Sequence, residues 1–353
     1  MISPDASLIQ AADLKDWVTR VFVRASLPND DAAVAADVLV TANLRGIDSH
    51  GVLQLPIKTR RVISGIVNTR PKLRVERDSP SAMLVDGDNG LGMVVGEWAM
   101  VWAIERALEG GAAVVGVRRS NHFGMSAYYA MMASAADLIG IAATNASATM
   151  APWGSVTPYL GTNPLAFAVP GGIDGGIVLD MATSQVAWGK VELAARAGKK
   201  IPLNWATDSA GRPTDDPDEA MKGMMLPLGG YKGYGLAFIV ETLCGVMTGA
   251  AFGLRVGDFY AHPDREENAG HSFIAIDPAR FMPLEHFKMR MAQMVEEIHA
   301  CRPAEGVDRI YLPGEIEMET AARRRREGIP LPPDVVSELR RLGEEVRVPF
   351  PDS

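Results

Sequence analysis

The stretch Asp86-Gly87-Asp88-Asn89-Gly90-Leu91-Gly92-Met93-Val94-Val95-Gly96 decides which fold this chain adopts. Its glycines follow a strand-like segment and open a predicted helix, as in a Rossmann phosphate loop with one extra residue. Arg118 and Arg119, after the next predicted strand, would suit a 2′-phosphate. However, a polar turn separates the strand from the glycines, and its two carboxylates would repel a pyrophosphate. We therefore interpret the stretch as a glycine-rich connection into a surface helix, and expect a fold other than Rossmann.

The hydrophobic pattern around this stretch predicts helices at both ends of the chain and mixed elements between them. Helices are expected at 8–25, 30–44, from 52 to 63, 95–108, 126–136, 234–248, 284–300 and 334–346. Strands are expected at 73–75, 82–86, 112–117, 139–144, 165–169, 177–179 and 272–276. The chain of 353 residues is long enough for two domains. We expect a helical lobe from residues 1–75 and 284–353, and a second domain from residues 76–283.

The overall composition is that of a globular protein, with 47% hydrophobic and 22% charged residues. A net charge of −8 argues against a nucleic-acid partner, which requires a basic face. The run Arg323–Arg326 is an exception, but acidic residues precede it, so a solvated helix face is expected. Cys244 and Cys301 form no disulfide framework, and the start of the chain lacks a secretion signal. We expect a cytoplasmic protein.

One apolar run, residues 235–254, approaches the length that spans a bilayer. Glu241 lies inside it, and a carboxylate in lipid is costly. A buried core helix is the better interpretation, and no membrane association is expected.

Several short segments place glycines and polar residues inside apolar surroundings, at predicted strand ends and helix starts. They are 120–124 (SNHFG), 161–164 (GTNP), 180–184 (DMATS) and 229–235 (GGYKGYG). Free backbone N–H groups at such positions bind anions. Lys232 among four glycines therefore suits a phosphate or ribose contact, although a flexible turn is the alternative.

The segment Arg45-Gly46-Ile47-Asp48-Ser49-His50-Gly51 places a histidine beside a hydroxyl and between glycines. Histidine exchanges a proton near neutral pH, so His50 is a candidate acid/base. The alternative is a structural histidine in a turn that ends a helix.

The motifs DSHG (48–51), SNHFG, GTNP, LDMATS (179–184), GGYKGYG and PGE (313–315) occur in this order. In this the chain resembles the malate/L-lactate dehydrogenase family of the second, non-Rossmann type. That family includes ureidoglycolate and sulfolactate dehydrogenases and piperideine/pyrroline-2-carboxylate reductases. The resemblance implies an NAD(P)-dependent oxidoreductase, a cofactor domain with a mostly antiparallel sheet flanked by helices, and a homodimer. It leaves the choice between NAD and NADP open.

The resemblance also implies roles for individual residues. His50 matches the proton donor, with Ser49 and Asp180 orienting it in a relay, and His122 matches a second active-site histidine that is either the acid/base or a cofactor contact. The positions that match cofactor contacts are His122, Ala146, Asp180, Met181, Ala182, Lys232, Pro313, Gly314 and Glu315.

Two positions depart from the family pattern. Ala146 stands where many members carry a serine near the nicotinamide. Gln54 stands where the family usually has the arginine that pairs with the substrate carboxylate. The neutral glutamine loses a charge-assisted contact of about 1.5–3 kcal/mol. Either Arg45, Arg60 or Arg61 replaces that arginine, or the substrate is not an ordinary 2-oxo acid.

The hypothesis is a reversible reduction of a 2-oxo acid, or of a cyclic imine 2-carboxylate, to a 2-hydroxy acid such as malate, lactate or sulfolactate. His50, as an imidazolium stabilised by Asp180, would supply the proton. The alternatives are a cofactor-binding relative with altered catalysis and, less favoured, a hydrolase with a Ser49-His50-Asp180 triad. Neighbouring Ser and His side chains rarely face each other, which argues against the triad. The six histidines show no metal-binding spacing, so no metal is expected.

Overall fold

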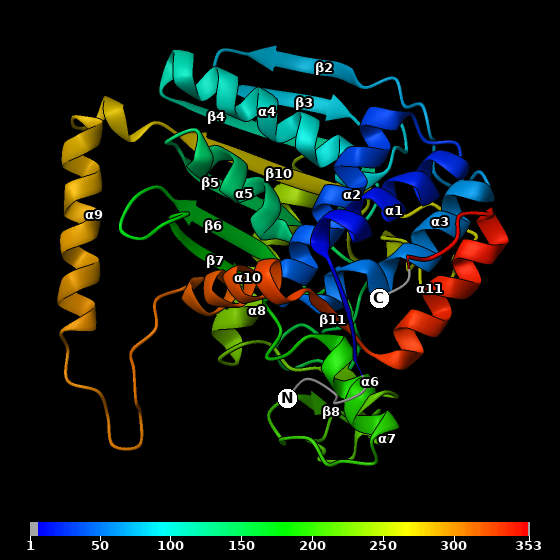
Figure 1. The fold of residues 1–353 in the computed structure, drawn as a ribbon. Helices are drawn as coiled ribbons and strands as arrows, with labels where there is room; N and C mark the ends of the chain where they lie inside the picture. Colours follow the sequence, from blue (N-terminus) through cyan, green and yellow to red (C-terminus); the bar gives the residue numbers. More distant parts are fainter. Residues whose placement is uncertain (1–5, 352–353) are drawn as a thin grey trace.

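The computed structural model describes residues 6–351, and its centre is a seven-stranded sheet (Figure 1). The strands are β2 (Arg74–Ser79), β3 (Ala82–Asp86), β4 (Ala112–Ser120), β5 (Ile139–Thr144), β6 (Leu165–Val169), β7 (Ile177–Met181) and β10 (Ala269–Ile276). They lie in the order β2-β3-β4-β10-β5-β6-β7. Only β3 and β4 pair in parallel, and the other neighbours are antiparallel. The prediction of a mostly antiparallel sheet in an α/β fold is confirmed.

Two helices, α4 (Gly92–Gly110) and α5 (Ser126–Ala135), cover one face of this sheet (Figure 1). Apolar side chains at alternate positions of β4, Val115 and Val117, point into the core beneath them. Gly116, between these two valines, faces Thr248 on the other side of the sheet. Both faces of the central strands are therefore covered.

A separate hydrophobic cluster joins the two ends of the chain. Its helices are α1 (Ala11–Arg24), α2 (Asn29–Leu44), α3 (Leu55–Ile63) and α11 (Pro333–Val346), with two short helical turns, η1 (Asp48–His50) and η2 (Val52–Gln54), before α3. Buried Leu14 and Trp17 pack with Leu339 and Leu342. Sequence periodicity missed a small antiparallel pair between the ends, β1 (Ser7–Ile9) with β11 (Ile329–Leu331), because each strand has three residues.

The other C-terminal helices differ in location. Helix α10 (Glu315–Glu327) packs on α2, whereas α9 (Leu284–His299) lies at the far edge of the molecule (Figure 1). There Lys288 pairs with Asp137 at 2.7 Å, and Val295 lies against Gly172. The partners of α9 therefore come from the middle of the chain. The division into 1–75 with 284–353 and 76–283 stays a prediction.

A small subregion lies between β7 and β10. It contains α6 (Trp188–Arg196), β8 (Ala206–Thr207), α7 (Pro217–Ala220) and β9 (Met224–Met225), followed by α8 (Tyr231–Glu241), a π-helical turn η3 (Thr242–Val246) and a short turn η4 (Gly253–Arg255). The expected helix at 234–248 is present as α8 and η3, whereas the short elements before it were not expected from the sequence. A further turn, η5 (Pro278–Arg280), follows β10. Elements of two to four residues are too short to leave a periodic pattern.

The expectation of a buried core helix around Glu241 is half right. Glu241 is buried, and its carboxylate accepts hydrogen bonds from Asn163 Nδ2 at 2.6 Å and Gly253 N at 2.8 Å. The opposite face of α8 leaves Phe238 and Ile239 exposed. Across residues 6–351, no helix combines the length and the apolar character needed to cross a membrane.

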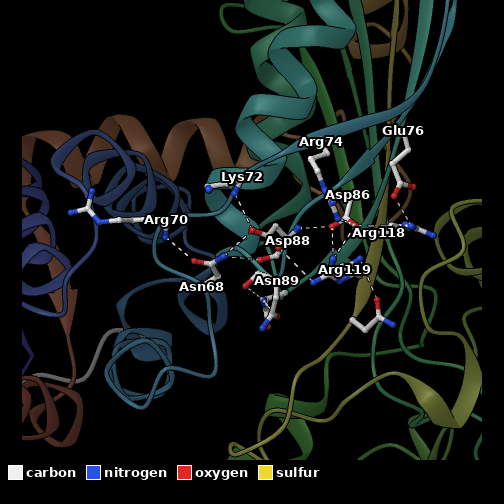
Figure 2. A network of polar contacts seen from close by, with 12 residues as sticks. Asn68, Arg70, Lys72, Arg74, Glu76, Asp86, Asp88, Asn89, Arg118 and Arg119 are labelled. Atoms are coloured by element: carbon white, nitrogen blue, oxygen red, sulfur yellow. Dashed lines mark hydrogen bonds and ion pairs between the residues drawn. The ribbon is translucent and has the colours of Figure 1, made fainter.

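The polar turn in the deciding stretch is the centre of an ion-pair network (Figure 2). Arg119 Nη1 lies 2.9 Å from Asp86 Oδ2, and Arg118 Nη2 lies 2.6 Å from Glu76 Oε1. Burial opposes ionisation of Asp86, but the Asp88 N–H and Arg119 hold the pKa of its carboxyl below the usual value. Both arginines are thus already paired with carboxylates, and the mostly antiparallel sheet confirms the expectation of a fold other than Rossmann.

The glycines of the same stretch serve close packing. A Cβ on Gly92 would lie 1.7 Å from the carbonyl oxygen of Asn121, and a Cβ on Gly96 would lie 2.9 Å from the Tyr129 ring. Glycine is kept here because the first turn of α4 touches the backbone that follows β4.

We predict that Gly92→Ala lowers the free energy of unfolding by about 3 kcal/mol or more, because backbone atoms must move to admit the methyl group. Gly110→Ala, in the last turn of the same helix, meets nothing within 4 Å and should be neutral or stabilising by up to about 1 kcal/mol. Calorimetric melting of both variants checks this. Equal melting temperatures would contradict the packing role of Gly92.

Candidate active site

The DSHG segment forms two short helical turns, η1 and η2, that link α2 to α3. Asn43, in the last turn of α2, holds the segment from inside. Its Oδ1 accepts a hydrogen bond from Val52 N at 2.8 Å, and its Nδ2 donates to Asp48 Oδ1 at 2.7 Å. A Cβ on Gly51 would lie 2.2 Å from Asn43 Oδ1, so glycine is required for the amide to fit.

Arg324 of α10 holds the same segment from the C-terminal end of the chain. It is 8% exposed, donates to both Asp48 carboxylate oxygens at 2.7 and 3.0 Å, and also bonds the carbonyl oxygen of Asn43. Interpreting Arg323–Arg326 as a solvated helix face was therefore wrong for Arg324, although its three neighbours in the run are exposed. Helical spacing turns one arginine of four toward α2.

The hydroxyl of Ser49 lies 3.0 Å from Nδ1 of His50. This is the contact expected of a residue that orients the imidazole. Our argument that neighbouring Ser and His side chains do not face each other was wrong here, because the tight η1 turn brings them together.

His122 lies in the connection between β4 and α5 and stacks on His50, with ring centroids 5.6 Å apart. The two histidines come from segments 72 positions apart in the sequence, and both are half-buried. Burial, and then the charge of Lys58, lowers the pKa of His50 to about 4. The same two causes hold the pKa of His122 well below its ordinary value. The surroundings of His50 therefore disfavour the imidazolium that we expected at this position.

Lys58 of α3 is a third member of this site, and the motifs did not indicate it. Its side chain is 4% exposed, and Nζ lies 3.0 Å from His122 Nδ1 and 3.0 Å from the His122 carbonyl oxygen. Burial lowers the pKa of Lys58 to about 8, the charge of Glu267 opposes this shift, and that of Arg61 adds to it. One signal was present in the sequence: Lys58 follows Gln54 by one turn of the helix expected from 52 to 63, so the two side chains were expected on one face of that helix.

Glu267 and Arg61 form a buried ion pair that binds the backbone of His122. Glu267 Oε2 accepts a hydrogen bond from His122 N at 2.9 Å, and Arg61 Nη2 lies 3.4 Å from Glu267 Oε1. Both side chains are buried, and burial raises the pKa of Glu267. Arg61 also donates to the carbonyl oxygens of Pro263 and Arg265 at 3.1 and 2.9 Å. Its guanidinium is therefore used within the protein.

Gln54 is buried against Ser49 and Tyr260. Its Nε2 donates to the Ser49 carbonyl oxygen at 2.9 Å and to the Tyr260 hydroxyl, whereas Oε1 has no hydrogen-bond partner among the described residues. A free carbonyl oxygen repels a carboxylate, so Gln54 does not replace the arginine of the family pattern. Arg60 points away, to Glu345 on the exposed surface at 3.1 Å.

Asp180, at the end of β7, has a different partner from the one we expected. Its Oδ2 accepts a hydrogen bond from Ala127 N at 2.8 Å, in the first turn of α5, where helix N–H groups favour an anion. Protein around the carboxylate raises its pKa to about 6, which the Ala127 N–H and the charge of Arg45 oppose. Within residues 6–351, no hydrogen bond joins Asp180 to His50, so neither the relay nor a Ser49-His50-Asp180 triad is formed.

Backbone hydrogen bonds bring three of the other motifs side by side. Thr183 N donates to the Thr162 carbonyl oxygen at 2.8 Å, and Leu228 N donates to the Thr183 carbonyl oxygen at 2.8 Å. The segments GTNP, DMATS and GGYKGYG thus adjoin. Lys232 lies exposed in the first turn of α8, directly after Gly229 and Gly230, whose φ angles of 58° and 70° favour glycine.

The remaining cofactor candidates adjoin these segments. Ala146 N donates to Asn163 Oδ1 of GTNP at 3.1 Å, and Met181 and Ala182 are half-buried after Asp180. Val178 N of β7 donates to the Pro313 carbonyl oxygen at 3.1 Å. A Cβ on Gly314 would lie 2.8 Å from the carbonyl oxygen of Val178.

Glu315, in the first turn of α10, is buried and bound within the protein. Burial by itself would raise the pKa of the Glu315 carboxyl, but the Leu312 N–H and His299 lower it below its usual value. Leu312 N lies 2.7 Å from Glu315 Oε2, and Arg309 also pairs with Glu315 at 3.3 Å. Its carboxylate therefore stabilises the Pro313–Glu315 turn.

The comparisons with known proteins agree with this arrangement. The family model described as malate/L-lactate dehydrogenase matches residues 9–340. A malate dehydrogenase of Pyrococcus horikoshii is 41% identical over 343 residues, which are 95% of this chain and 94% of the relative. A solved structure of malate dehydrogenase from Pyrococcus horikoshii OT3 has a TM-score of 0.92 at 36% identity and covers 99% of each chain.

Two further relatives carry a cofactor in their names. Ureidoglycolate dehydrogenase (NAD(+)) of Escherichia coli K12 is 36% identical over 331 residues, 94% of each chain. (2R)-3-sulfolactate dehydrogenase (NADP(+)) of Chromohalobacter salexigens is 38% identical over 316 residues, 89% of this chain and 91% of the relative. The fold and site therefore define an NAD(P)-dependent oxidoreductase that acts on hydroxy acids. This chain belongs to the malate/L-lactate dehydrogenase family.

We predict that Arg324→Gln destabilises the protein by about 1.5–3 kcal/mol, because Asp48 and the Asn43 carbonyl lose charged hydrogen-bond donors. The η1 turn that carries His50 should loosen with it. Arg323→Gln, the exposed neighbour, is the matched control and should change stability by less than about 0.5 kcal/mol. Urea unfolding of both variants measures the difference. Loss of stability in the Arg323 variant alone would contradict this role of Arg324.

Proposed function

We propose that this protein reversibly reduces a 2-oxo acid, or a cyclic imine 2-carboxylate, with its proton transfer at the His50–His122 pair. The observation that carries the proposal is the stacking of the two imidazoles, with the buried Lys58 Nζ 3.0 Å from Nδ1 of His122. A carbonyl that accepts hydride becomes an alkoxide and requires a proton, and positioned imidazoles transfer protons efficiently.

The residues around Lys232 fit a nicotinamide dinucleotide. Gly229 has open space where a Cβ would stand, and Lys232 is an exposed cation in the first turn of an eleven-residue helix. Such a backbone with a lysine suits a pyrophosphate. Once bound, NAD(P)H supplies the hydride. Lys232 would hold the phosphates of the cofactor. The rest of the cofactor would be lined by Ala146, the segment Asp180–Ala182 and the Pro313–Glu315 turn.

Other parts of the proposal concern substrate and surroundings. We assign Arg45 to the substrate side of the site. Its charge lowers the pKa of the Asp180 carboxyl, and the charge of Asp180 raises the pKa of Arg45. Gln54, with its free Oε1, would accept a hydrogen bond from a neutral substrate group.

The net charge of −8 supports partners other than nucleic acid, and the two free cysteines support a reducing cytoplasm.

The test is a spectrophotometric screen at the nicotinamide absorbance near 340 nm, with NADH and NADPH against 2-oxo acids and cyclic imines. We expect turnover of at least one 2-carboxylate substrate, and reverse oxidation of the corresponding 2-hydroxy acid. Tight binding of NAD(P)H without turnover across the panel would instead support a cofactor-binding relative with altered catalysis, which the glutamine at position 54 makes a specific alternative.

We also propose a homodimer formed through α8 and the π-helical turn after it. This surface exposes a row of large apolar side chains: Leu236, Phe238, Ile239, Val246 and Met247. Exposed apolar patches of this kind mark protein interfaces in soluble proteins.

Phe238→Asp should convert the dimer to a monomer, because a carboxylate would be buried without a partner at the interface. Phe238 is 53% exposed in the single chain, and Leu108 at the end of α4 is similarly exposed at 51%. Leu108→Asp is therefore the control and should leave the molar mass in light scattering at twice the chain mass. A wild-type protein that is monomeric at micromolar concentration would contradict the proposal.

A further inference from the structure

We propose that Lys58 holds the proton of the reaction and passes it to the substrate oxygen through the imidazole of His122. This inference rests on the proposed function, since it concerns the proton that accompanies hydride transfer. It gives a role to a lysine that none of the sequence motifs indicated. Lys58 does not touch the substrate in this scheme and is a positioning residue that acts through His122.

The contact between Lys58 and His122 fixes the tautomer of the histidine. An ammonium has three donors and no acceptor, so Lys58 Nζ donates to Nδ1 of His122 across 3.0 Å and to the His122 carbonyl oxygen across 3.0 Å. Nδ1 is then the acceptor nitrogen, and the proton of the neutral ring lies on Nε2. The ring therefore carries an N–H on the side opposite Lys58.

The surroundings of Lys58 favour a cation that gives up a proton easily. The Phe259 ring centroid lies 5.7 Å from Nζ, and no carboxylate lies within ion-pair distance of Lys58 in the described part of the chain. Other titratable and charged groups face it from several segments: His122 after β4, His50 on η1, Arg61 on α3 and Glu267 before β10. Among the charged groups named here, Glu267 is the one whose charge stabilises the ammonium, and its carboxylate is shared with Arg61 and the His122 N–H.

The order of proton affinities agrees with this geometry. Burial lowers the pKa of Lys58 to about 8, whereas that of His50 falls to about 4 and that of His122 lies well below its ordinary value. At pH 7 the lysine is therefore the protonated member of the three. An isolated neutral imidazole is a poor acid, but one that regains a proton on Nδ1 as it releases one from Nε2 stays neutral throughout.

The proton balance of the step is as follows. When bound, NAD(P)H would supply the hydride for the new C–H bond, and the electron pair of the C=O bond would remain on oxygen. The His122 Nε2–H bond breaks as the O–H bond forms, and Nδ1 takes a proton from the Lys58 ammonium. Lys58 is left as a neutral amine beside Nδ1–H. The starting state returns when Nδ1 gives its proton back to Lys58 and Nε2 takes one from solvent.

The kinetic test compares Lys58→Met and Lys58→Arg with the wild type, using a substrate found in the screen. We expect kcat for reduction to fall about 100-fold or more in both variants, because arginine keeps the charge but does not release a proton. KM should change by less than about 3-fold. Wild-type kcat for reduction should decline above about pH 8 as Lys58 loses its proton, and this decline should be absent in Lys58→Met.

Two further measurements separate proton supply from structure. Propylamine should restore activity to Lys58→Ala in proportion to its ammonium form, because it fills the space of the deleted side chain. Lys72→Met, at an exposed lysine, is the matched control and should behave as wild type. A Lys58→Arg variant with wild-type kcat, or an unchanged pH profile in Lys58→Met, would overturn the proposal.

A readout without turnover distinguishes this proposal from the proposed function. In protein with ¹⁵N-labelled histidine at pH 7, we expect His122 Nδ1 to show the shift of an unprotonated acceptor, and to show a mixture of tautomers in Lys58→Met. A wild-type His122 with its proton on Nδ1 would overturn the relay even in an active enzyme. The expected tautomer in a protein inactive across the screen would instead contradict the proposed function alone.

Discussion

The ion pair between Arg324 and Asp48 is the interaction on which the site depends. It joins α10, near the end of the chain, to the turn that carries His50, and the same guanidinium satisfies the last turn of α2 through the Asn43 carbonyl. Asn43 then bonds both ends of the turn. Because each group completes the hydrogen bonding of another, the position of His50 follows from the packing of both chain ends.

Charge near the two histidines is arranged to keep them neutral. Lys58 contributes a buried positive charge that disfavours a second one on His50 or His122, and Glu267 offsets part of its desolvation. An arginine at position 54, which is always protonated, would add a cation one helical turn from Lys58. The glutamine found there avoids that repulsion, so Gln54 and Lys58 are understood together as one arrangement of charge.

The glycine-rich stretch after β3 shows how one composition serves different physical purposes. In a Rossmann fold such glycines allow a phosphate to approach the backbone. Here Gly92 allows the Asn121 backbone to approach α4, and the carboxylate of Asp86 is met by Arg119. Asn121 lies next to His122, so the close contact at Gly92 also positions the loop that carries the second histidine.

The sequence by itself determined the fold class, most helices and strands, and the family, because periodic apolar positions and contiguous motifs such as GGYKGYG are local in the chain. It also indicated that His50 and His122 belong to one site. Only the tertiary structure decided which partners the residues of the site have. Lys58 beside His122, Arg324 on Asp48 and Asp180 over the first turn of α5 join residues that lie 53 to 276 positions apart. Side-chain contacts of that kind depend on how helices pack, and burial then sets the protonation states, so neither can be read from spacing along the chain.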